Sequence, residues 1–305
     1  MRPSLNFMKI LVTGASGLIG SAAVSHFQRN GHTVVSAVRT GSSSPTTLAW
    51  DPAKGTIDSG HLDGIDAVLH LAGAGIGDSR WTDSYKREIL ESRTKGTTLL
   101  ANAIADMPRK PSVFLSASAI GIYGATGDEE LTESSAHGTG FLAEVCEMWE
   151  SSTVAAERAG VRTVHLRTGI VLSKNGGALK KQLPIFKAGL GGKFGAGKQW
   201  QSWISIEDEI GAITHLLASS VSGAVNLTAP TPVTNAEFTK TLASVLKRPS
   251  LLPIPSFGPK LLLGSELAEA LLFTGQRVLP SVLLNDGYQF RHPTLDVALR
   301  AILGK

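Results

Sequence analysis

The sequence predicts an α/β fold: a doubly wound parallel sheet followed by a smaller, less regular α+β lobe. Short apolar runs bounded by Gly, Asp or Pro alternate with longer stretches whose apolar residues recur at helical spacing. After Gly169 this alternation gives way to a segment rich in Gly and Lys, and then to helices punctuated by proline. Because strands that alternate with helices form a parallel sheet covered on both faces, the first half predicts the sheet and the second half the lobe.

Each predicted element follows from its local pattern. Apolar, β-rich runs predict strands at residues 9–14, 33–39, 66–73, 112–118 and 161–169. Helical spacing predicts helices at residues 18–31, 80–107 and 141–160, of which the first and third close on glycine. We place the sheet domain at residues 8–170 and the lobe at residues 171–305. The absence of a repeat or a low-complexity linker predicts a tight interface between them, and part of the lobe can return to the sheet.

Composition and charge narrow the class of protein. The 305 residues are 42% hydrophobic and 18% charged, with 33 glycines, which is typical of a compact globular protein with many tight turns. The net charge is only +4, and the basic pairs at 109–110 and 180–181 stand apart without aromatic residues, which argues against nucleic acid. No apolar run has the length of a membrane span, and the N-terminal segment lacks the pattern of a signal peptide.

The single cysteine supports the same class. Cys146 cannot form an internal disulfide and has no metal ligands near it in the sequence, so we expect a reducing, cytoplasmic setting and no metal site. The expected partner is a small molecule. The oligomeric state stays open between monomer and homodimer.

Three glycines after the first strand predict a dinucleotide site. In "KILVTGASGLIGSAAVSHF", Gly14 allows a tight turn, Gly17 lets the backbone approach a pyrophosphate, and Gly20 lets helix and strand pack closely. The helix that starts here offers free N–H groups and a positive dipole end to phosphate. The alternative is a close-packed strand, turn and helix without a ligand. The predicted cofactor loop comprises Gly14, Ser16, Gly17, Leu18, Ile19 and Gly20.

The end of the second strand, "SAVRT", selects between the two nicotinamide cofactors. A carboxylate at this point would bind a ribose 2′-hydroxyl, whereas the planar fork of Arg39 can pair with a 2′-phosphate. We therefore expect NADP(H), bound by Arg39 with Thr40 beside it. The alternative is an exposed arginine at a strand end.

Longer motifs extend this interpretation to almost the whole chain. The glycine spacing, "HLAG" at 70–73 and "SASAIGIYG" at 116–124 resemble the extended short-chain dehydrogenase/reductase superfamily. "HLAGAGIGDSRWTDSYKREILESR", "LRTGIVLSKNGGAL", "WQSWISIEDE" and "GQRVLPSVLLNDGYQFRHPTL" resemble its atypical branch, the epimerase family or sugar-nucleotide epimerase-like proteins. The resemblance runs from Met8 onward and is far more specific than the glycines alone.

The resemblance implies a Rossmann-type domain that binds NADP(H), and a C-terminal lobe that completes a substrate cleft. In this family the "HLAG" segment lines the nicotinamide ribose, the strand-end serine faces the substrate, and residues near "LRTG" close over the nicotinamide. These roles carry over to His70, Leu71, Ala72 and Gly73, to Ser116 and Ser118, and to Leu166, Arg167 and Thr168. For His70, a structural role at a strand end is the stronger alternative to proton transfer.

The family's acid/base pair is missing from this chain. Active members use a tyrosine and a lysine four residues later, and the lysine lowers the tyrosine pKa from its ordinary value of about 10. In "GFLAEVCEMWE" the two positions hold Phe141 and Val145, which cannot transfer a proton. Tyr123, in "IYG", corresponds to a tyrosine that flanks the cleft in extended members, and we consider both a catalytic and a shaping role for it. Arg93 stands where extended members carry Asn, and we expect it to face the cofactor and to bind a phosphate or the substrate.

These features support three readings of function. The first is an NADP(H)-dependent oxidoreductase or epimerase-like enzyme that acts on a small carbonyl or sugar-nucleotide-like compound, with Ser118 bonded to the reacting oxygen. The second is a non-catalytic NADP(H)-binding sensor or scaffold that has lost the Tyr/Lys pair. The third is an interaction module whose sheet only resembles a Rossmann domain. Because a fold does not determine chemistry, the sequence leaves the substrate open.

Overall fold

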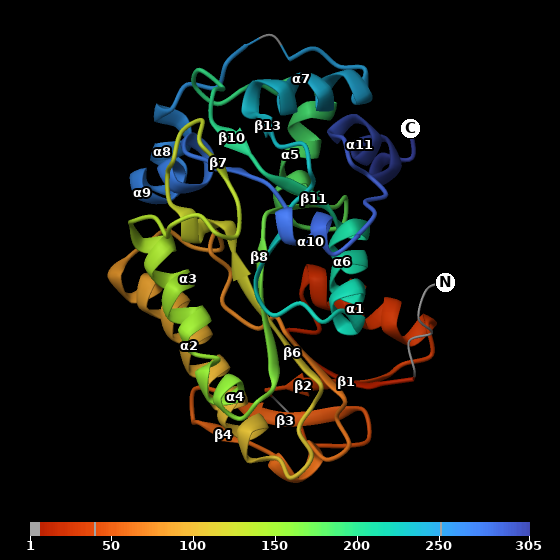
Figure 1. Ribbon diagram of the computed structural model, residues 1–305. Coiled ribbons are helices and arrows are strands. Elements are labelled where there is room, and N and C mark those ends of the chain that lie inside the picture. Colours follow the sequence, from red (N-terminus) through yellow and green to blue (C-terminus); the bar gives the residue numbers. More distant parts are fainter. Residues whose placement is uncertain (1–6, 40, 251) are drawn as a thin grey trace.

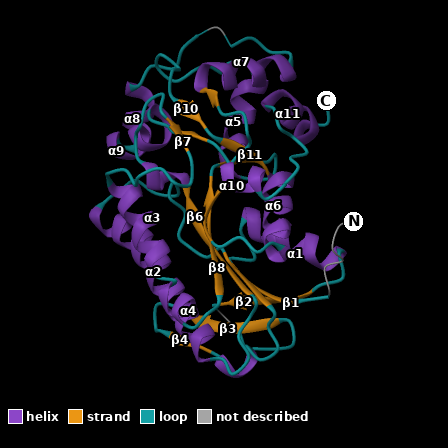
Figure 2. Ribbon diagram, in the orientation of Figure 1, coloured by secondary structure: helices purple, strands orange, loops and turns teal. Residues whose placement is uncertain are grey.

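The structure, a computed structural model, describes residues 7–39, 41–250 and 252–305. Its centre is an eight-stranded sheet, in which every neighbouring pair is parallel except β3 and β4 (Figures 1 and 2). In spatial order the strands are β4 (Thr56–Ile57), β3 (Thr47–Asp51), β2 (Thr33–Val38), β1 (Lys9–Thr13), β5 (Ala67–His70), β6 (Val113–Ala119), β8 (Arg162–Thr168) and β12 (Gly223–Leu227). The predicted doubly wound α/β fold and its five predicted strands are thereby confirmed.

The strand order places a crevice at the end of β1. The chain moves outward from β1 to β2, β3 and β4, and then crosses back to β5, β6 and β8 on the other side of β1. Ile10 pairs with Val34 on one side and with Ala67 on the other. The connections after β1 and β5 therefore leave on opposite sides, which is where parallel sheets bind their ligands.

Two helical layers cover the sheet because its strands alternate apolar side chains between the faces. Ile10 and Val12 of β1 face the layer of α1 (Leu18–Arg29) and α6 (Ile206–Ala218). Leu11 faces the layer of α2 (Asp83–Asp106) and α4 (Val154–Arg158), which α3 (Phe141–Ser151) continues. Both faces are thus buried, as continuous apolar strands require.

The predicted helix at 141–160 is in fact two helices, α3 and α4. The hydroxyl of Ser152 donates to the Met148 carbonyl, and that of Thr153 donates to the Glu150 carbonyl. Thr153 Oγ1 also lies 2.9 Å from Nε2 of His165 on β8. These local bonds compete with the helical ladder, so the helix breaks where the threonine is held against the sheet.

Two further strands, β3 and β4, extend the sheet beyond the predicted set. β3 has five residues and β4 only two, at the edge of the sheet. Such short runs carry too little periodicity to stand out in the sequence.

The lobe returns one strand to the sheet. β12 pairs with β8 from Gly223 to Leu227, and α6 before it packs on α1, so this part of residues 171–305 belongs to the sheet domain. The rest of the lobe lies beyond the carboxyl ends of β6 and β8 (Figure 1). The lobe has its own apolar core, formed by α5 (Gly177–Lys187), α7 (Asn235–Leu246) and α11 (Leu295–Leu303).

Short elements join the lobe to the sheet domain. β9 (Ile170–Leu172) pairs with β11 (Trp203–Ser205), and β7 (Glu130–Leu131) pairs with β14 (Arg277–Val278). The remaining elements are η1 (Ser59–His61), η2 (Ile120–Tyr123), β10 (Trp200–Gln201), β13 (Val233–Thr234), α8 (Phe257–Leu263), α9 (Ser265–Ala268), the π-helical turn η3 (Glu269–Phe273) and α10 (Ser281–Asn285).

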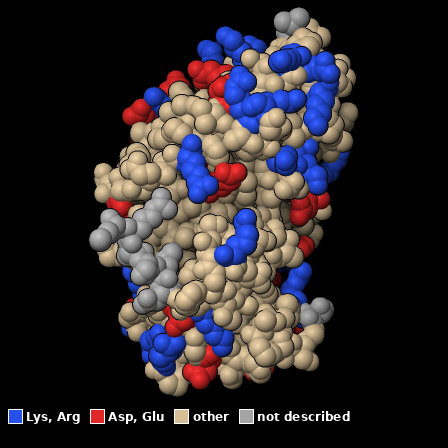
Figure 3. All heavy atoms as spheres, turned by 90° about the vertical axis from the view of Figure 1, so that its right-hand side faces the viewer, with Lys and Arg blue, Asp and Glu red and all other residues tan. Residues whose placement is uncertain are grey.

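The surface in Figure 3 shows Lys and Arg side chains gathered over the C-terminal lobe at the top. They come together there although the basic residues are spread along the sequence. Among the described helices, none combines the length and the apolar character needed to cross a bilayer.

Candidate functional site

The glycine loop forms a cradle that side chains would fill. Gly14 has φ +67°, and a Cβ there would lie 2.8 Å from the carbonyl carbon of Leu71. A Cβ on Gly20 would lie 2.1 Å from the carbonyl oxygen of Gly14, so the start of α1 is pressed against the turn. Gly17 is the N-cap of α1, and its first turn holds no acidic residue. This exposed helix start, with no side-chain cap, fits a phosphate group.

The loop after β5 is tied to the end of β1. His70 is fully buried, and its ring nitrogens lie 2.6 Å from Thr13 Oγ1 and 2.9 Å from Thr97 Oγ1. Burial lowers the pKa of His70 to about 3, so the ring stays neutral and holds position. Thr13 Oγ1 also accepts bonds from the N–H groups of Leu71 and Ala72. This arrangement agrees with a structural role for His70.

The predicted residues of the glycine loop, of the end of β2 and of the segment after β5 lie at the carboxyl ends of three neighbouring strands. Ser16 and Gly17 are exposed at the start of α1, and Gly73 is exposed just past β5. Leu18 and Ile19 are half-buried in the first turn of the helix. Arg39 is exposed at the end of the adjacent strand β2, and Thr40 lies outside the described residues.

The strand-end serines and Tyr123 lie in the interior of the protein. From the sequence we had expected the serines to face the substrate and Tyr123 to flank the cleft. Ser116 is fully buried, and its Oγ has no hydrogen-bond partner in the described part of the chain. Ser118 is 4% exposed and donates to Oε1 of Glu150 over 2.6 Å. Tyr123 is fully buried and donates to Oδ1 of Asn226 over 2.7 Å. In this structure the Tyr123 side chain therefore does not flank the cleft, because its hydroxyl is bonded to Asn226 in the interior.

A buried arginine connects Ser118, Glu150 and Tyr123 into one hydrogen-bond network, so these polar side chains are satisfied away from water. Arg167 donates to both carboxylate oxygens of Glu150, at 2.8 and 2.9 Å, and to the Tyr123 hydroxyl at 3.0 Å. Burial acts to lower the pKa of Arg167, but its bonds to Glu150 raise it above the ordinary value. Tyr123 thus has a cation beside it, which the sequence did not reveal, yet burial keeps its pKa above the ordinary value of a phenol.

The three residues expected to close over the nicotinamide are divided between the two faces of the sheet. Leu166 is part of the core beneath α6, and Arg167 is 3% exposed in the network on the other face. Thr168 is half-buried and donates to Oε1 of Glu209 over 3.0 Å. In this conformation, only Thr168 of the three has appreciable exposed surface.

Phe141 and Val145, which the sequence motifs align with the family's acid/base pair, have apolar surroundings in the structure. Phe141 opens α3 and packs edge-on against Trp81, with ring centres 4.9 Å apart. The ammonium of Lys86 lies 5.1 Å from the centre of the Phe141 ring. Val145, one turn on, is 2% exposed. Arg93 approaches α3 from α2, with its guanidinium 4.9 Å from the centre of the Trp149 ring.

Two adjoining cavities open between the sheet domain and the lobe. The larger, of about 620 Å³, lies between the start of α3 and the segment from α8 to η3. Its lining residues are Trp81, Gly121, Gly124, Ala125, Thr139, Gly140, Phe141, Leu142, Ala143, Lys260, Ser265, Glu266, Glu269, Ala270, Thr274 and Gln276. Phe141 therefore forms part of the cavity wall, and apolar side chains and glycines make up most of its sheet-domain side.

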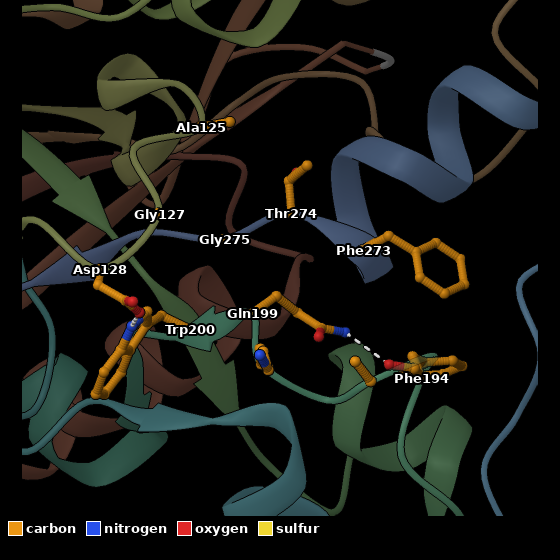
Figure 4. A pocket seen from close by; sticks show the side chains of 11 residues that line it. Ala125, Gly127, Asp128, Phe194, Gln199, Trp200, Phe273, Thr274 and Gly275 are labelled. Carbon is orange, nitrogen blue, oxygen red and sulfur yellow. Dashed lines mark hydrogen bonds between the residues drawn. The ribbon is translucent and has the colours of Figure 1, made fainter.

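The smaller cavity, of about 400 Å³, shares Ala125 and Thr274 with the first. Figure 4 shows Trp200 turned toward Asp128, and the Trp200 Nε1 donates to Oδ1 of Asp128 over 2.7 Å. Across the cavity the Gln199 amide donates to the Phe194 carbonyl. Trp200 is thus a wall residue, whereas Trp203 is fully buried in the core of the lobe.

The charges around the cavities are largely paired. Lys86 forms an ion pair with Glu266 at 2.6 Å, and Lys260 forms one with Glu269 at 2.8 Å. Arg277, which belongs to β14, pairs with Glu130 of β7 and lies over the Trp200 ring. Lys86, Lys260 and Arg277 each face a carboxylate and so offer little free charge to a ligand, whereas Lys198, on the smaller cavity, forms no ion pair among the described residues.

Sequence reasoning missed three buried polar residues of this region: Glu150, Asn226 and Glu209. Glu150 lies one residue after Trp149 on the inner face of α3, where a charged residue in an apolar stripe is a usable signal. Asn226 and Glu209 gave no such signal in the sequence, because β12 and α6 reach the sheet domain only through tertiary contacts.

The family comparisons agree with this geometry. Residues 10–228 match the model of the NAD dependent epimerase/dehydratase family, and residues 254–302 match a domain of unknown function, DUF1731. The chain is 42% identical over 291 residues to an epimerase family protein of Mycobacterium tuberculosis, covering 95% of this chain and 96% of that protein. It is 35% identical over 302 residues to the human epimerase family protein SDR39U1, covering 97% of this chain and all of that protein.

Solved structures give the same result. The crystal structure of human SDR39U1 with NADPH superposes with a TM-score of 0.89 at 34% identity, covering 97% of this chain and 99% of that one. A nucleoside-diphosphate sugar epimerase from Corynebacterium glutamicum gives a TM-score of 0.81 at 36% identity, covering 98% of this chain and 59% of that one. The resemblance noted in the sequence motifs is confirmed.

Proposed function

The chain belongs to the NAD-dependent epimerase/dehydratase family, and from this premise we propose that it is an NADP(H)-dependent oxidoreductase or epimerase-like enzyme acting on a small carbonyl compound. The observation that carries the proposal is the glycine cradle at the end of β1, which a Cβ at Gly14 or Gly20 would fill. An uncapped helix start beside that cradle, at the crevice where the strand order reverses, suits a dinucleotide pyrophosphate.

We assign the cofactor to the edge formed by β1, β2 and β5. Bound there, NADPH would supply a hydride, and the chain's residues would hold and orient it. Arg39 would pair with the 2′-phosphate by its planar fork. The human SDR39U1 structure was solved with NADPH, which supports the same choice. The proposed cofactor residues are Gly14, Ser16, Gly17, Leu18, Ile19, Gly20, Arg39, Thr40, Leu71, Ala72, Gly73, Arg93 and Thr168. His70, Ser116, Leu166 and Arg167 are buried behind them and would support the site without contacting the cofactor.

For the proposed substrate, the cavity beside Phe141 supports a carbonyl compound over a sugar nucleotide. Its wall is largely apolar, and the lysines at its rim already pair with Glu266 and Glu269. A diphosphate would compete with these ion pairs, whereas an uncharged apolar group would gain from burial against Phe141 and Trp81.

Ser118 and Tyr123, the catalytic candidates of the sequence, take a positioning role in this proposal. Ser118 donates its hydroxyl proton to Glu150, and Tyr123 is enclosed by Asn226 and Arg167. We therefore propose that they fix the strand end on which the reaction takes place, through Glu150, instead of exchanging a proton with the substrate.

A paired titration with NADPH and NADH, followed by fluorescence, tests the cofactor assignment. The wild type is expected to bind NADPH more tightly than NADH, and Arg39→Ala to weaken NADPH by roughly tenfold or more, since a bond between charged groups contributes about 1.5–3 kcal/mol. NADH binding should stay unchanged. Arg29→Ala, an exposed arginine at the end of α1, is the matched control. Equal binding of both nucleotides by the Arg39 variant and the wild type would contradict the assignment.

A second candidate function is a non-catalytic NADP(H)-binding sensor or scaffold. Phe141 and Val145 favour it, because they leave the family's proton-transfer positions without a titratable group. Absorbance at 340 nm separates the two with NADPH and a panel of aromatic aldehydes, quinones and sugar nucleotides. Turnover that Ser118→Ala abolishes at unchanged NADPH affinity would exclude the sensor, and binding without turnover across the panel would support it.

A further inference from the structure

One buried cation lacks an acidic partner among the residues that the structure describes. Arg93, on α2, is only 7% exposed, and no carboxylate of the described chain forms an ion pair with it. Its Nη1 donates to the Ile89 carbonyl of its own helix over 3.0 Å, and its guanidinium lies on the Trp149 ring. Burial lowers the pKa of Arg93 from its ordinary value, as expected for a cation removed from water.

The contrast with Arg167 shows what is missing. Arg167 is buried to a similar degree, but it forms an ion pair with Glu150 and donates to both carboxylate oxygens. A buried charge is costly unless it is paired, and a cation on an aromatic face recovers only part of that cost. Arg93 therefore carries a cost in the ligand-free protein that an anionic or strongly polar oxygen ligand would offset.

The surroundings of Arg93 say where that ligand lies. A Cβ built on Gly73 would meet the Arg93 Cζ at 3.3 Å and Nη1 at 3.5 Å, so the guanidinium rests against the exposed backbone just past β5. On its other side is Trp149, one helical turn after Val145 on the same side of α3. The guanidinium thus lies between the end of β5 and the face of α3 that lacks a lysine.

We propose that Arg93 is the cation of the nicotinamide half of the cofactor site, supplying from α2 the charge that Val145 cannot supply from α3. This inference rests on the proposed function. Its ligand is the ribosyl phosphate of the nicotinamide half, whose hydroxyl and phosphate oxygens match the N–H groups of a guanidinium. Because the charge comes from a different helix, the site keeps a hold on the cofactor without a lysine that could tune a tyrosine.

The test divides the cofactor into halves. Arg93→Met keeps the length of the side chain and removes the charge, and Arg93→Lys keeps the charge and loses the fork. Isothermal titration is carried out with NADPH, with nicotinamide mononucleotide and with 2′,5′-ADP. Arg93→Met should weaken NADPH and nicotinamide mononucleotide by roughly 10- to 100-fold and leave 2′,5′-ADP unchanged. The affinity of Arg93→Lys for NADPH and nicotinamide mononucleotide should lie between those of Arg93→Met and the wild type. Arg87 is an exposed arginine of α2, and Arg87→Met should bind all three compounds as the wild type does.

Stability of the ligand-free protein gives a second readout. If Arg93 is an uncompensated charge, Arg93→Met should melt at or above the wild-type Tm, because removing a buried unpaired charge relieves its desolvation cost. A merely structural arginine predicts the opposite, with a lowered Tm and weaker binding of both halves of the cofactor.

Unchanged NADPH affinity in Arg93→Met would overturn the inference and would point to a substrate anion instead. A parallel loss of 2′,5′-ADP binding would overturn it too, in favour of a structural role. Failure of the proposed function looks different, since the wild type itself would then bind neither NADPH nor 2′,5′-ADP.

Discussion

Glu150 of α3 and Arg167 of β8 meet in a two-pronged ion pair, with Nε to Oε1 at 2.8 Å and Nη2 to Oε2 at 2.9 Å. Both side chains are buried, and Ser118 and Tyr123 complete the network from the end of β6. The pair fastens α3 to the sheet. It also gives Ser118 and Tyr123 a structural role.

Removing one member of this pair should destabilise the fold strongly. Glu150→Ala leaves Arg167 buried without its carboxylate, so we expect the free energy of unfolding to fall by about 3–5 kcal/mol, measured by urea denaturation. Glu147→Ala, an exposed glutamate on the same helix, should change it by less than about 0.5 kcal/mol. Similar losses in the two variants would show that the pair does not hold α3.

The same carboxyl should contribute to acid sensitivity. Burial acts to raise the pKa of Glu150, but hydrogen bonds from Arg167 and Ser118 lower it below the ordinary value of 4.5. A group with a depressed folded pKa stabilises the protein above its unfolded pKa and loses that contribution as the pH falls through the folded pKa. Glu150→Gln should therefore show a smaller loss of stability below about pH 4.5 than the wild type, and parallel curves would contradict this.

Glu209 should act in the opposite direction. It is fully buried, Thr168 donates to one oxygen, and the other has no partner in the described part of the structure. Burial raises its pKa to about 8, so the folded protein keeps this proton up to that pH, whereas the unfolded chain releases it near 4.5. The wild type should lose stability as the pH rises from about 4.5 through 8.

Glu209→Gln should remove this dependence, because an amide cannot release a proton. Urea denaturation at acid, neutral and mildly alkaline pH measures it. At the alkaline end we expect the variant to be more stable than the wild type, on the order of 2 kcal/mol. A constant difference at every pH would count against a titrating Glu209.

Gly20→Ala should damage both the fold and the cofactor loop. The new methyl would lie 2.1 Å from the Gly14 carbonyl oxygen, so the turn proposed to hold the cofactor must move. We expect a loss of about 1–3 kcal/mol and weaker NADPH binding. Gly258→Ala, in α8, meets nothing within 4 Å and should be neutral or stabilising by up to about 1 kcal/mol. Full NADPH affinity in Gly20→Ala would show that the turn does not shape the site.

Tyr123→Phe should behave as a structural change. It leaves Asn226 Oδ1 and Arg167 Nη1 each one partner short, so we expect a loss of about 1–3 kcal/mol by urea denaturation with unchanged NADPH affinity. A kcat lowered a hundredfold or more at unchanged stability would instead show that Tyr123 takes part in proton transfer.

The sequence predicted the glycine turn well because its signal is local. Gly14, Gly17 and Gly20 lie within seven consecutive residues, and each is needed by the backbone of one strand, one turn and one helix. The apolar alternation of β1, β5 and β6 is local in the same sense, since both faces of a parallel sheet are buried wherever the neighbours lie.

The surroundings of individual side chains were not predictable in this way. Tyr123 looked like a cleft residue, and the structure encloses it between Asn226, 103 residues away, and Arg167, 44 residues away. Arg93 and Arg167 are the same residue type at nearly the same burial, and only the fold gives one a carboxylate and leaves the other against Gly73 and Trp149.

By itself, then, the sequence determined the alternating strands and helices, the glycine turn and the apolar residues at the acid/base positions, because each depends on neighbours along the chain. The tertiary structure decided which polar groups are buried in pairs and which cation stays unpaired at the edge of the sheet. Charge pairing and desolvation depend on distances between segments that are remote in the chain, and only the folded packing of α2, α3 and β8 sets those distances.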